Sequence, residues 1–417
     1  MNSPRKLAAD AVGRCMGEGA FSNLVVSSEL SRGTLQGPDR SLYTALVYTT
    51  LENILTIDSI ISMCSSKPLS NLHPSVLNTL RVAAAQLWYM DRIPASAAVN
   101  EAVNLTAVSA KKFVNAVLRA LCRERDKIDA QLSEAPDCIK YSICDSVLSL
   151  IKRQYPEEYE RIALSARQRI PLALRANTLK LTREELLNAI DGSKPGKYVS
   201  TAVLIYNETA QYAASESDRY FVQGEPSQYA VELLSPMPGD LVVDVAACPG
   251  GKSVGAAIAM NNSGKILSFD IHPNKLPLIT RTAARMGVDI IETGVRDGRT
   301  PAGELAGKAD RVICDVPCSA LGLINSKPGV RLKDAEAFAS LPQLQYTMLE
   351  NACEMLRPGG RVVYSTCTFN RDENEGVTSP LLSQHRDMVK ISDRLFMTYR
   401  DGTEGFYVCC MEKRKDG

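Results

Sequence analysis

Apolar residues recur at helical spacing along the first part of the chain. The segments 41–61 and 75–90 place Leu, Ile, Val and Ala three or four residues apart, which is the period of one helix face. In residues 91–105, Pro94 and Ser96 stand where a further helix would begin. None of these stretches alternates apolar and polar residues as a half-buried strand does. We therefore predict an all-helical domain over residues 1–130.

The last helix expected in this region, residues 109–128, carries basic side chains around an apolar stripe. A basic helix face is often only solvated, but it is also typical of a surface that meets RNA or another protein, and the sequence is compatible with both. The stripe consists of Phe113, Val114, Val117, Leu118 and Leu121, and the basic residues are Lys111, Lys112, Arg119, Arg123, Arg125 and Lys127.

The pattern changes after residue 130. Residues 131–215 are mixed: "PLALRANTLKLTREELLNAI" predicts a strand followed by a helix whose start is marked by a capping box, Thr182 with Glu185. From 216 to 417, short apolar strands alternate with helices, which predicts an α/β domain with a Rossmann-like parallel sheet covered on both faces. The expected strands are "DLVVDVA", "GKILSFD", "DIIETGV", "DRVICDV", "GRVVYST" and "GFYVCCM".

Composition narrows the class of protein. The 417 residues exceed what one core usually supports, and 48 Lys and Arg balance 47 Asp and Glu, so any nucleic-acid surface must be a local patch. The N-terminus has no apolar stretch like that of a signal peptide, and no segment resembles a membrane span, so we expect a cytoplasmic protein. The 12 cysteines are then expected to be reduced, and with 3 histidines they show no metal-site spacing.

A glycine-rich turn follows the first strand of the α/β domain. In "LVVDVAACPGGKSVGAA", Gly250 and Gly251 allow a tight turn and a close approach of a ligand to the backbone. A helix that begins near Lys252 would direct free N–H groups at that ligand. The spacing is neither that of a P-loop nor G-x-G-x-x-G, which disfavours nucleotide triphosphates and dinucleotides.

Acidic residues stand at the ends of three successive expected strands, at Asp244, Asp270 and Asp297. Each alone could be an ordinary turn or cap residue. Together at one edge of a sheet, they suit a nucleoside that carries an amine and no phosphate, and Asp270 is placed to accept hydrogen bonds from ribose hydroxyls. The sequence therefore predicts S-adenosylmethionine as the cofactor.

Two cysteines follow the next two strands, Cys318 after "DVP" and Cys367 after "YST". A cysteine chosen at random is usually a buried apolar residue. Here both thiols would face the ligand crevice if the two strands are neighbours, because ligands bind beyond the carboxyl ends of such strands. A thiolate that adds to carbon 6 of a pyrimidine makes carbon 5 nucleophilic enough to take a methyl group. Cys318 is then a candidate for removing the proton from carbon 5, with Asp315 placed to hydrogen-bond the base.

The motifs "DVAACPGGKS", "DVPCSALG" and "YSTCTFNRDENE" resemble the signatures of the Nol/Nop/Sun family of RNA 5-methylcytosine methyltransferases. The resemblance implies that Cys367 is the nucleophile, that Cys318 is needed for product release, and that Asp315 and Lys252 contact the base or the cofactor. It also implies that the turn binds S-adenosylmethionine. The cofactor residues expected on this basis are Asp244, Ala246, Ala247, Cys248, Pro249, Gly250, Gly251, Lys252, Asp270, Asp297 and Asp315.

The resemblance extends over nearly the whole chain. "AVNEAVNL" and "FVNAVLR" are similar to the NusB-like helical domain, and "RANTLKLTREEL" is similar to an RNA-binding segment found before the catalytic domain. The arrangement implies three domains, 1–130, 131–215 and 216–417, a monomer, and small-subunit ribosomal RNA as substrate. Arg175 and Asn177 are candidate RNA contacts in a groove between the middle segment and the sheet.

Several positions depart from the family pattern. Ala246 and Cys248 exchange the usual Cys and Ala, "VQGEPS" lacks the usual Gln-Asp pair at 224–226, and "INSKPGVRL" at 324–332 lacks the usual acid and Trp. Because the last two departures are expected near the substrate, they bear on the RNA target more than on the reaction. Two other readings compete with the enzyme: a non-catalytic RNA-binding or assembly protein that keeps the fold, and a thiol–disulfide enzyme, which would leave the glycine turn and acids unexplained.

Overall fold

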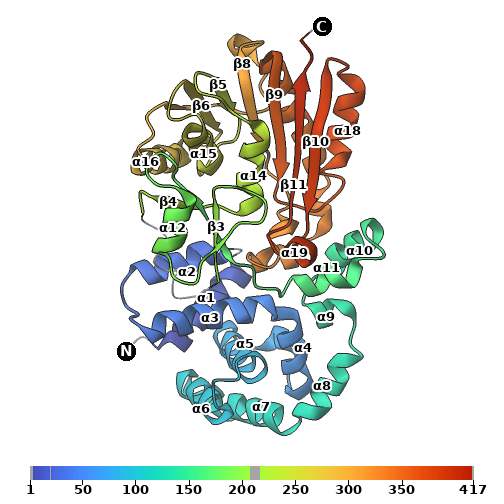
Figure 1. Cartoon of the computed structure of the whole chain (residues 1–417). Helices are drawn as coiled ribbons and strands as arrows, with labels where there is room; N and C mark the ends of the chain where they lie inside the picture. Colours follow the sequence, from blue (N-terminus) through green and yellow to red (C-terminus); the bar gives the residue numbers. More distant parts are fainter. Residues whose placement is uncertain (1–2, 19, 207–216, 416–417) are drawn as a thin grey trace. The chain divides into compact units, whose positions relative to one another are not determined.

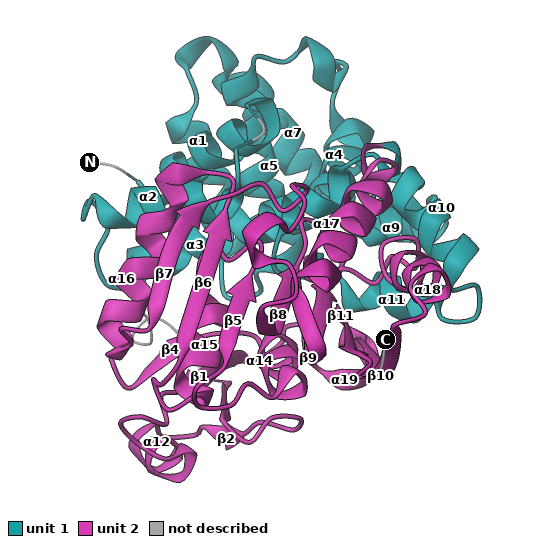
Figure 2. Ribbon diagram, turned by 90° about the horizontal axis from the view of Figure 1, so that it is seen from above, with its two compact units in different colours: residues 1–167, 324–336 teal, residues 168–323, 337–417 magenta. Residues whose placement is uncertain are grey.

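The computed structural model describes residues 3–18, 20–206 and 217–415, which form two compact units (Figures 1 and 2). Unit 1 contains residues 1–167 together with 324–336, and unit 2 contains 168–323 together with 337–417. These boundaries differ from the sequence-based ones, because residues 131–167 fall with the helices and residues from 168 onward fall with the large sheet. In the described part of the chain, no helix has the length and apolar character needed to cross a membrane.

Unit 1 is helical, and its helices continue well beyond residue 130. The apolar stripe predicted on the last helix of the NusB-like region is confirmed: Val114, Val117, Leu118 and Leu121 of α7 are buried, whereas Arg119 and Arg123 are exposed. The helices are α1 (Pro4–Gly17), α2 (Ser22–Ser31), α3 (Pro38–Glu52), α4 (Ile54–Cys64), α5 (Pro74–Tyr89), α6 (Ala95–Leu105), α7 (Lys111–Arg123), α8 (Arg125–Ser133), α9 (Asp137–Tyr141), α10 (Asp145–Gln154) and α11 (Tyr159–Ser165), with short 3-10 turns η1 (Leu69–Asn71) and η2 (Val108–Ala110).

Residues 324–336 belong to unit 1 although they lie far along the chain. Arg331, in the 3-10 turn η6 (Pro328–Leu332), is fully buried and donates hydrogen bonds to three backbone carbonyls: that of Ile324 (3.1 Å), that of Glu52 (2.8 Å) and that of Ala166. Glu52 ends α3 and Ala166 follows α11, so the guanidinium sits at two helix C-termini, where a cation is favoured. This segment therefore completes the helical unit.

The middle segment forms a small antiparallel sheet with the strand order β2-β3-β1-β4. The predicted capping box is confirmed, since Thr182 accepts from the Glu185 N–H and Glu185 accepts from the Thr182 N–H. Its elements are β1 (Leu172–Ala176), α12 (Arg183–Ala189), β2 (Lys194–Pro195), β3 (Ala202–Ile205) and β4 (Tyr220–Val222).

The large sheet has seven strands in the order β10-β11-β9-β8-β5-β6-β7 (Figure 2). The strands β9, β8, β5, β6 and β7 are parallel neighbours, as the alternation of strands and helices predicts. Helices cover both faces: residues of α14, α15 and α16 pack on one, and residues of α17 and α18 on the other. The strands are β5 (Leu241–Asp244), β6 (Lys265–Asp270), β7 (Ile291–Val295), β8 (Ala309–Asp315), β9 (Leu356–Thr366), β10 (Met388–Phe396) and β11 (Phe406–Lys413). The helices and short turns are α14 (Glu225–Leu234), α15 (Gly251–Ala259), η3 (Pro273–Lys275), α16 (Leu276–Met286), η4 (Gly303–Leu305), η5 (Leu321–Leu323), η7 (Ala335–Phe338), α17 (Leu341–Met355), α18 (Glu375–Gln384) and α19 (Thr398–Asp401).

The sequence-based prediction of the sheet was wrong at one edge. β11 runs antiparallel to both β9 and β10, and β10 itself was not predicted (Figure 1). Only the short α19 separates β10 from β11, which leaves no room for the crossover that a parallel pair requires. β10 was not predicted because it lacks an apolar run. As an edge strand it has few buried residues and carries charged ones such as Lys390, Asp393 and Arg394.

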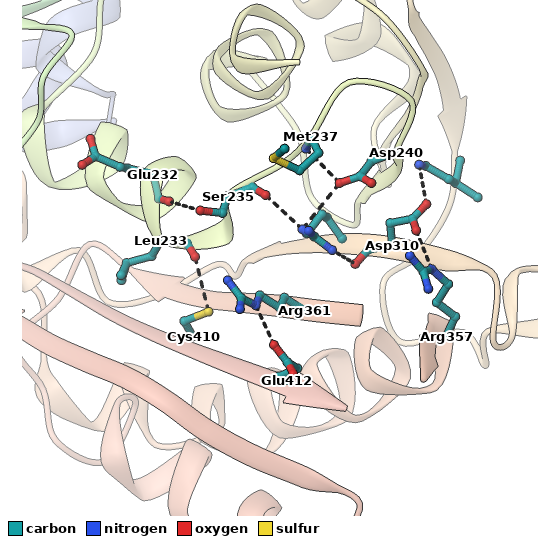
Figure 3. Close-up of polar contacts among 12 residues, drawn as sticks. Glu232, Leu233, Ser235, Met237, Asp240, Asp310, Arg357, Arg361, Cys410 and Glu412 are labelled. Carbon is teal, nitrogen blue, oxygen red and sulfur yellow. Dashed lines mark hydrogen bonds and ion pairs between the residues drawn. The ribbon is translucent and has the colours of Figure 1, made fainter. Parts of the chain in front are cut away.

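The amino-terminal edge of the sheet holds a structural polar network (Figure 3). Asp310, at the start of β8, accepts hydrogen bonds from the Leu241 N–H (2.7 Å) and the Arg357 guanidinium (2.5 Å). Arg361 of β9 pairs with Glu412 of β11 at 2.7 Å. These contacts join neighbouring strands at the end remote from the carboxyl edge, so they serve stability and not ligand binding.

Candidate active site

The carboxyl edge of the sheet gathers the predicted acids. Asp244 ends β5 and is 1% exposed; the Ser253 hydroxyl donates to its Oδ2 at 2.6 Å, and Ser268 donates in turn to Ser253 at 2.8 Å. Burial raises the pKa of Asp244 to about 7, although the Ser253 hydrogen bond acts in the opposite direction. Among the described residues its buried Oδ1 has no hydrogen-bond partner. A buried acceptor left open in this way is suited to a ligand donor.

The other two acids differ from each other. Asp270 ends β6, is nearly buried, and accepts from the His272 N–H at 2.9 Å. Asp297 follows β7 and is held by the Arg299 guanidinium, 2.6 Å away, which lowers the pKa of Asp297. The structure thus brings all three acids to one edge, but the carboxylate of Asp297 already has a cationic partner.

The glycine turn has the geometry that its sequence predicts. Gly250 adopts a φ of 104°, and a Cβ there would lie 3.1 Å from the Cα of Ile279, so no other residue fits easily. The Ala247 N–H donates to the Phe269 carbonyl at 2.7 Å, which fixes the turn to β6, and α15 begins at Gly251. Cys248 and Pro249 are joined by a cis peptide bond. With Ala246, these residues form a backbone cradle beside Asp244 that fits a small nucleoside cofactor.

Lys252 and Asp315 form an ion pair beside this turn. The Lys252 Nζ lies 2.7 Å from Asp315 Oδ2 and 5.3 Å from the centre of the Phe406 ring. The Ser365 hydroxyl donates to Asp315 Oδ1 at 2.6 Å. Three strand ends, those of β8, β9 and β11, therefore contribute to one polar cluster, and Asp315 is the more exposed partner, with 34% of its side chain accessible.

The two predicted thiols meet. β8 and β9 are parallel neighbours, and the Sγ atoms of Cys318 and Cys367 lie 3.2 Å apart. The hydrogen bond to Cys367 raises the pKa of the Cys318 thiol well above its ordinary value, and burial, the Cys367 charge and the Glu373 carboxylate add to the effect. These contacts favour the protonated form of Cys318.

Two candidate RNA contacts from the sequence were wrong. Arg175 is 4% exposed: a Cβ on Gly255 would lie 2.7 Å from its Nη1, so the guanidinium packs against α15, and it donates to Gln223 at 3.3 Å. Asn177 is fully buried, and its amide donates to the carbonyls of Asp218 and Met286, both at 2.9 Å. Both side chains hold the small sheet to the large one within unit 2 and do not face solvent.

Sequence reasoning missed further groups around the site. Glu373 and Asn374 are buried behind the thiols, and Glu404 is a carboxyl whose pKa is raised by burial, with the charge of Lys252 opposing this. For Glu373 and Asn374 the signal was present in "YSTCTFNRDENE", where two acids flank an Asn shortly after the strand that ends at Thr366. Acids in such a polar stretch are usually solvated, which is why the pattern did not single them out.

Family models and curated relatives match this chain over most of its length. Family models match residues 231–406 ("16S rRNA methyltransferase RsmB/F"), 2–123 ("NusB family") and 147–208 ("RsmF/B-like, ferredoxin-like domain"). A probable ribosomal RNA small subunit methyltransferase B of Bacillus subtilis is 31% identical over 99% of both chains, and the Erwinia tasmaniensis ribosomal RNA small subunit methyltransferase B is 27% identical over 99% of both.

Solved structures share the fold. PH0851 is 25% identical, with a TM-score of 0.79 over 99% of both chains. NSun6 from Pyrococcus horikoshii, solved with SFG, is 21% identical, with a TM-score of 0.58 over 66% of this chain and 99% of its own. The resemblance to the Nol/Nop/Sun methyltransferases is confirmed, and the chain belongs to the ribosomal RNA small subunit methyltransferase B family.

Proposed function

We propose that this chain methylates carbon 5 of a cytosine in small-subunit ribosomal RNA, with Cys367 as nucleophile and Cys318 as the acid–base thiol. The observation that carries the proposal is the 3.2 Å approach of the two Sγ atoms at the carboxyl edge of the sheet. It is supported by family membership and by the names of the relatives. We further propose that the protein is a monomer, and that it acts in the cytoplasm, where its ribosomal RNA substrate would be.

The cofactor would lie against Asp244, Asp270 and the turn from Ala246 to Gly251. Bound there, S-adenosylmethionine supplies an electrophilic methyl group. Asp244 would accept a hydrogen bond through its open Oδ1, and the backbone cradle would accept the nucleoside because Gly250 leaves its face free of a side chain. In this proposal Asp297, already paired with Arg299, contributes less than Asp270.

The thiols divide the work. Cys367 as thiolate forms a bond to carbon 6 of the base, which makes carbon 5 nucleophilic toward the methyl group. Once Cys367 is bonded to carbon, it no longer accepts a hydrogen bond from Cys318, and the main cause of the high Cys318 pKa disappears. Cys318 then releases its proton to solvent and takes the proton from carbon 5. The Cys367–carbon bond breaks with its electron pair returning to sulfur.

Lys252 and Asp315 would hold the base during these steps. Asp315 keeps an accessible oxygen next to the thiols, and Ser365 and Lys252 fix its orientation. A carboxylate can accept from the exocyclic amine of cytosine, and Lys252 can stabilise negative charge that develops on the ring after Cys367 adds. The base must be unpaired or flipped out to reach them.

The test uses purified protein, S-adenosylmethionine with a labelled methyl group, and unmodified small-subunit ribosomal RNA. Labelled 5-methylcytosine is expected with wild type and with Cys122→Ala, a control thiol exposed on the helical unit. Cys367→Ala should give no product. Cys318→Ala should accumulate a covalent protein–RNA adduct that resists denaturant, and its absence would refute the division of roles.

A second candidate, thiol–disulfide exchange, is favoured by the same short distance between Cys318 and Cys367. That reaction needs a disulfide substrate and no S-adenosylmethionine. Reduction of a small disulfide by the wild-type protein, lost in both Cys→Ala variants, would support it, whereas methyl transfer without such reduction would exclude it.

A further inference from the structure

A buried carboxylate links the two loops that carry the thiols. Glu373 lies between β9 and α18 and is fully buried. Its Oε2 accepts from the backbone N–H of Ser319, next to Cys318, at 2.9 Å, and its Oε1 accepts from the Asn370 amide, in the loop that follows Cys367, at 2.9 Å. One side chain therefore touches both loops directly.

A third donor completes this link. The Gln345 amide of α17 lies 2.9 Å from Glu373 Oε2 and 3.0 Å from the Pro317 carbonyl. Cys318 is thus held on both sides: Gln345 binds the residue before it, and Glu373 binds the residue after it. The Tyr364 hydroxyl adds a 2.6 Å hydrogen bond to the Glu373 carbonyl, which ties this residue back to β9.

The neighbouring contacts align the same two loops. Ser319 and Thr368 share a hydroxyl–hydroxyl hydrogen bond of 2.8 Å, and the Gly322 N–H donates to the Cys367 carbonyl at 3.0 Å. Asn374 accepts from Thr366 at 2.6 Å and donates to the Thr368 carbonyl at 3.1 Å. The residues before and after each thiol are therefore anchored, while the thiols themselves remain partly accessible.

The link needs a side chain with two acceptor oxygens. Glu373 Oε2 accepts from the Ser319 N–H and the Gln345 amide, and Oε1 accepts from the Asn370 amide. A glutamine would keep one oxygen and turn an NH2 group toward one of these donors, so at least one donor would lose its acceptor. The Glu373 carboxylate also adds to the raised pKa of the Cys318 thiol, after the Cys367 hydrogen bond, burial and the Cys367 charge.

We propose that Glu373 is a positioning residue for methyl transfer, which holds the Cys318 loop against the Cys367 loop. This inference rests on the proposed roles of the two thiols. It adds that the mutual position of the thiols is set by a buried carboxylate that binds both loops.

The experiment compares wild type with Glu373→Gln, which keeps the size but replaces one acceptor oxygen by an NH2 group, and with Asp372→Asn as a control for loss of an exposed carboxylate next to it. Iodoacetamide labelling of the protein without RNA is followed by mass spectrometry across a pH series. In wild type, Cys367 should be labelled at lower pH than Cys318. In Glu373→Gln, Cys318 should be labelled several-fold faster at a given pH, and Asp372→Asn should match wild type.

Turnover gives the second readout. For Glu373→Gln we expect kcat to fall by about 10- to 100-fold with KM for RNA nearly unchanged, and more adduct than wild type, because the Cys318 loop loses an anchor and Cys318 is misplaced for taking the proton from carbon 5. Unchanged labelling profiles together with wild-type adduct levels would overturn the inference. If Glu373→Gln does not fold, Asn370→Ala, which removes one donor, should raise adduct levels in the same direction, and wild-type levels there would count equally against it.

The two proposals fail in different ways. If Cys318→Ala itself forms no adduct, the proposed function fails, whatever Glu373 does. If Cys318→Ala traps RNA as expected but Glu373→Gln behaves as wild type, only the role of Glu373 fails.

Discussion

Replacing Gly322 by alanine should displace Cys367, the proposed nucleophile, without changing a reacting group. Gly322 follows Cys318 by four residues; its N–H donates to the Cys367 carbonyl at 3.0 Å, and its own carbonyl accepts from the Gly405 N–H at 2.8 Å. It is therefore the backbone bridge among the loops that follow β8, β9 and α19. A side chain at this position would have to fit between backbone atoms that cannot rotate away.

The size of the effect follows from the geometry. A Cβ at position 322 would lie 1.9 Å from the Gly405 carbonyl oxygen and 2.9 Å from that of Cys367, where real contacts are essentially never under 3.0 Å. The backbone must therefore move by about 1 Å, and a misplacement of that size near a reacting group costs on the order of 100-fold in rate. This corresponds to about 2.7 kcal/mol of transition-state stabilisation.

The assay is the single-turnover rate of methyl transfer at saturating cofactor and RNA, with cofactor affinity and the thermal unfolding midpoint measured alongside. Gly17→Ala is the matched control, because a Cβ there has nothing within 4 Å. We expect a rate loss for Gly322→Ala, and little change in cofactor affinity. A rate within about twofold of wild type would refute the reasoning, since it would mean that Cys367 keeps its position without this bridge.

Three further outcomes are expected. The affinity for S-adenosylmethionine should rise from pH 6 to 8. Burial raises the pKa of Asp244 to about 7, and its ionised form binds a cationic ligand. Calorimetry with Asp244→Asn should show weaker binding that no longer depends on pH in this range. Asp310→Asn should lower the free energy of unfolding at pH 7 by about 1 to 3 kcal/mol. Burial alone would raise the pKa of Asp310, but hydrogen bonds from Leu241 and Arg357 lower it below 3.8. The stabilisation is therefore present above pH 3.8 and is lost as the pH falls through the lower pKa of the folded state. Urea unfolding of both proteins at pH 7 and pH 3 checks this, because an equal difference in the free energy of unfolding at both pH values would contradict it. Arg331→Met should destabilise the protein by about 2 to 5 kcal/mol in urea unfolding, because three carbonyls lose their donor, and a loss under 1 kcal/mol would contradict that reading.

Much of this site could be predicted because strand ends are visible in sequence. Short, mainly apolar strands precede Asp244, Asp270, Asp315 and Cys367, and parallel strands bring their carboxyl ends to one edge. The prediction that both thiols face one crevice required β8 and β9 to be neighbours, and they pair in parallel.

The remaining features depend on tertiary packing that leaves no local pattern. Arg175 is charged, so its sequence predicts a solvent-facing side chain, but it is buried because Gly255 leaves room for it on α15. Glu373 lies in a polar stretch typical of a loop, and only the fold brings Gln345 and Ser319 to its carboxylate. Neither composition nor periodicity indicates that residues 324–336 belong to the helical unit.

The place of residues 324–336 in the helical unit affects the order in which the protein can fold during synthesis. Arg331 supplies donors to the carbonyls of Glu52 and Ala166, so the helical unit lacks part of its interior until residue 336 has been synthesised. At chain elongation rates of about 5 to 20 residues per second, synthesis from residue 167 to residue 336 takes on the order of 10 to 30 s, and strands β5 to β8 are made in that time. The helical unit is therefore completed only after these strands of the large sheet, and a fragment that stops at residue 167 lacks the buried guanidinium of Arg331.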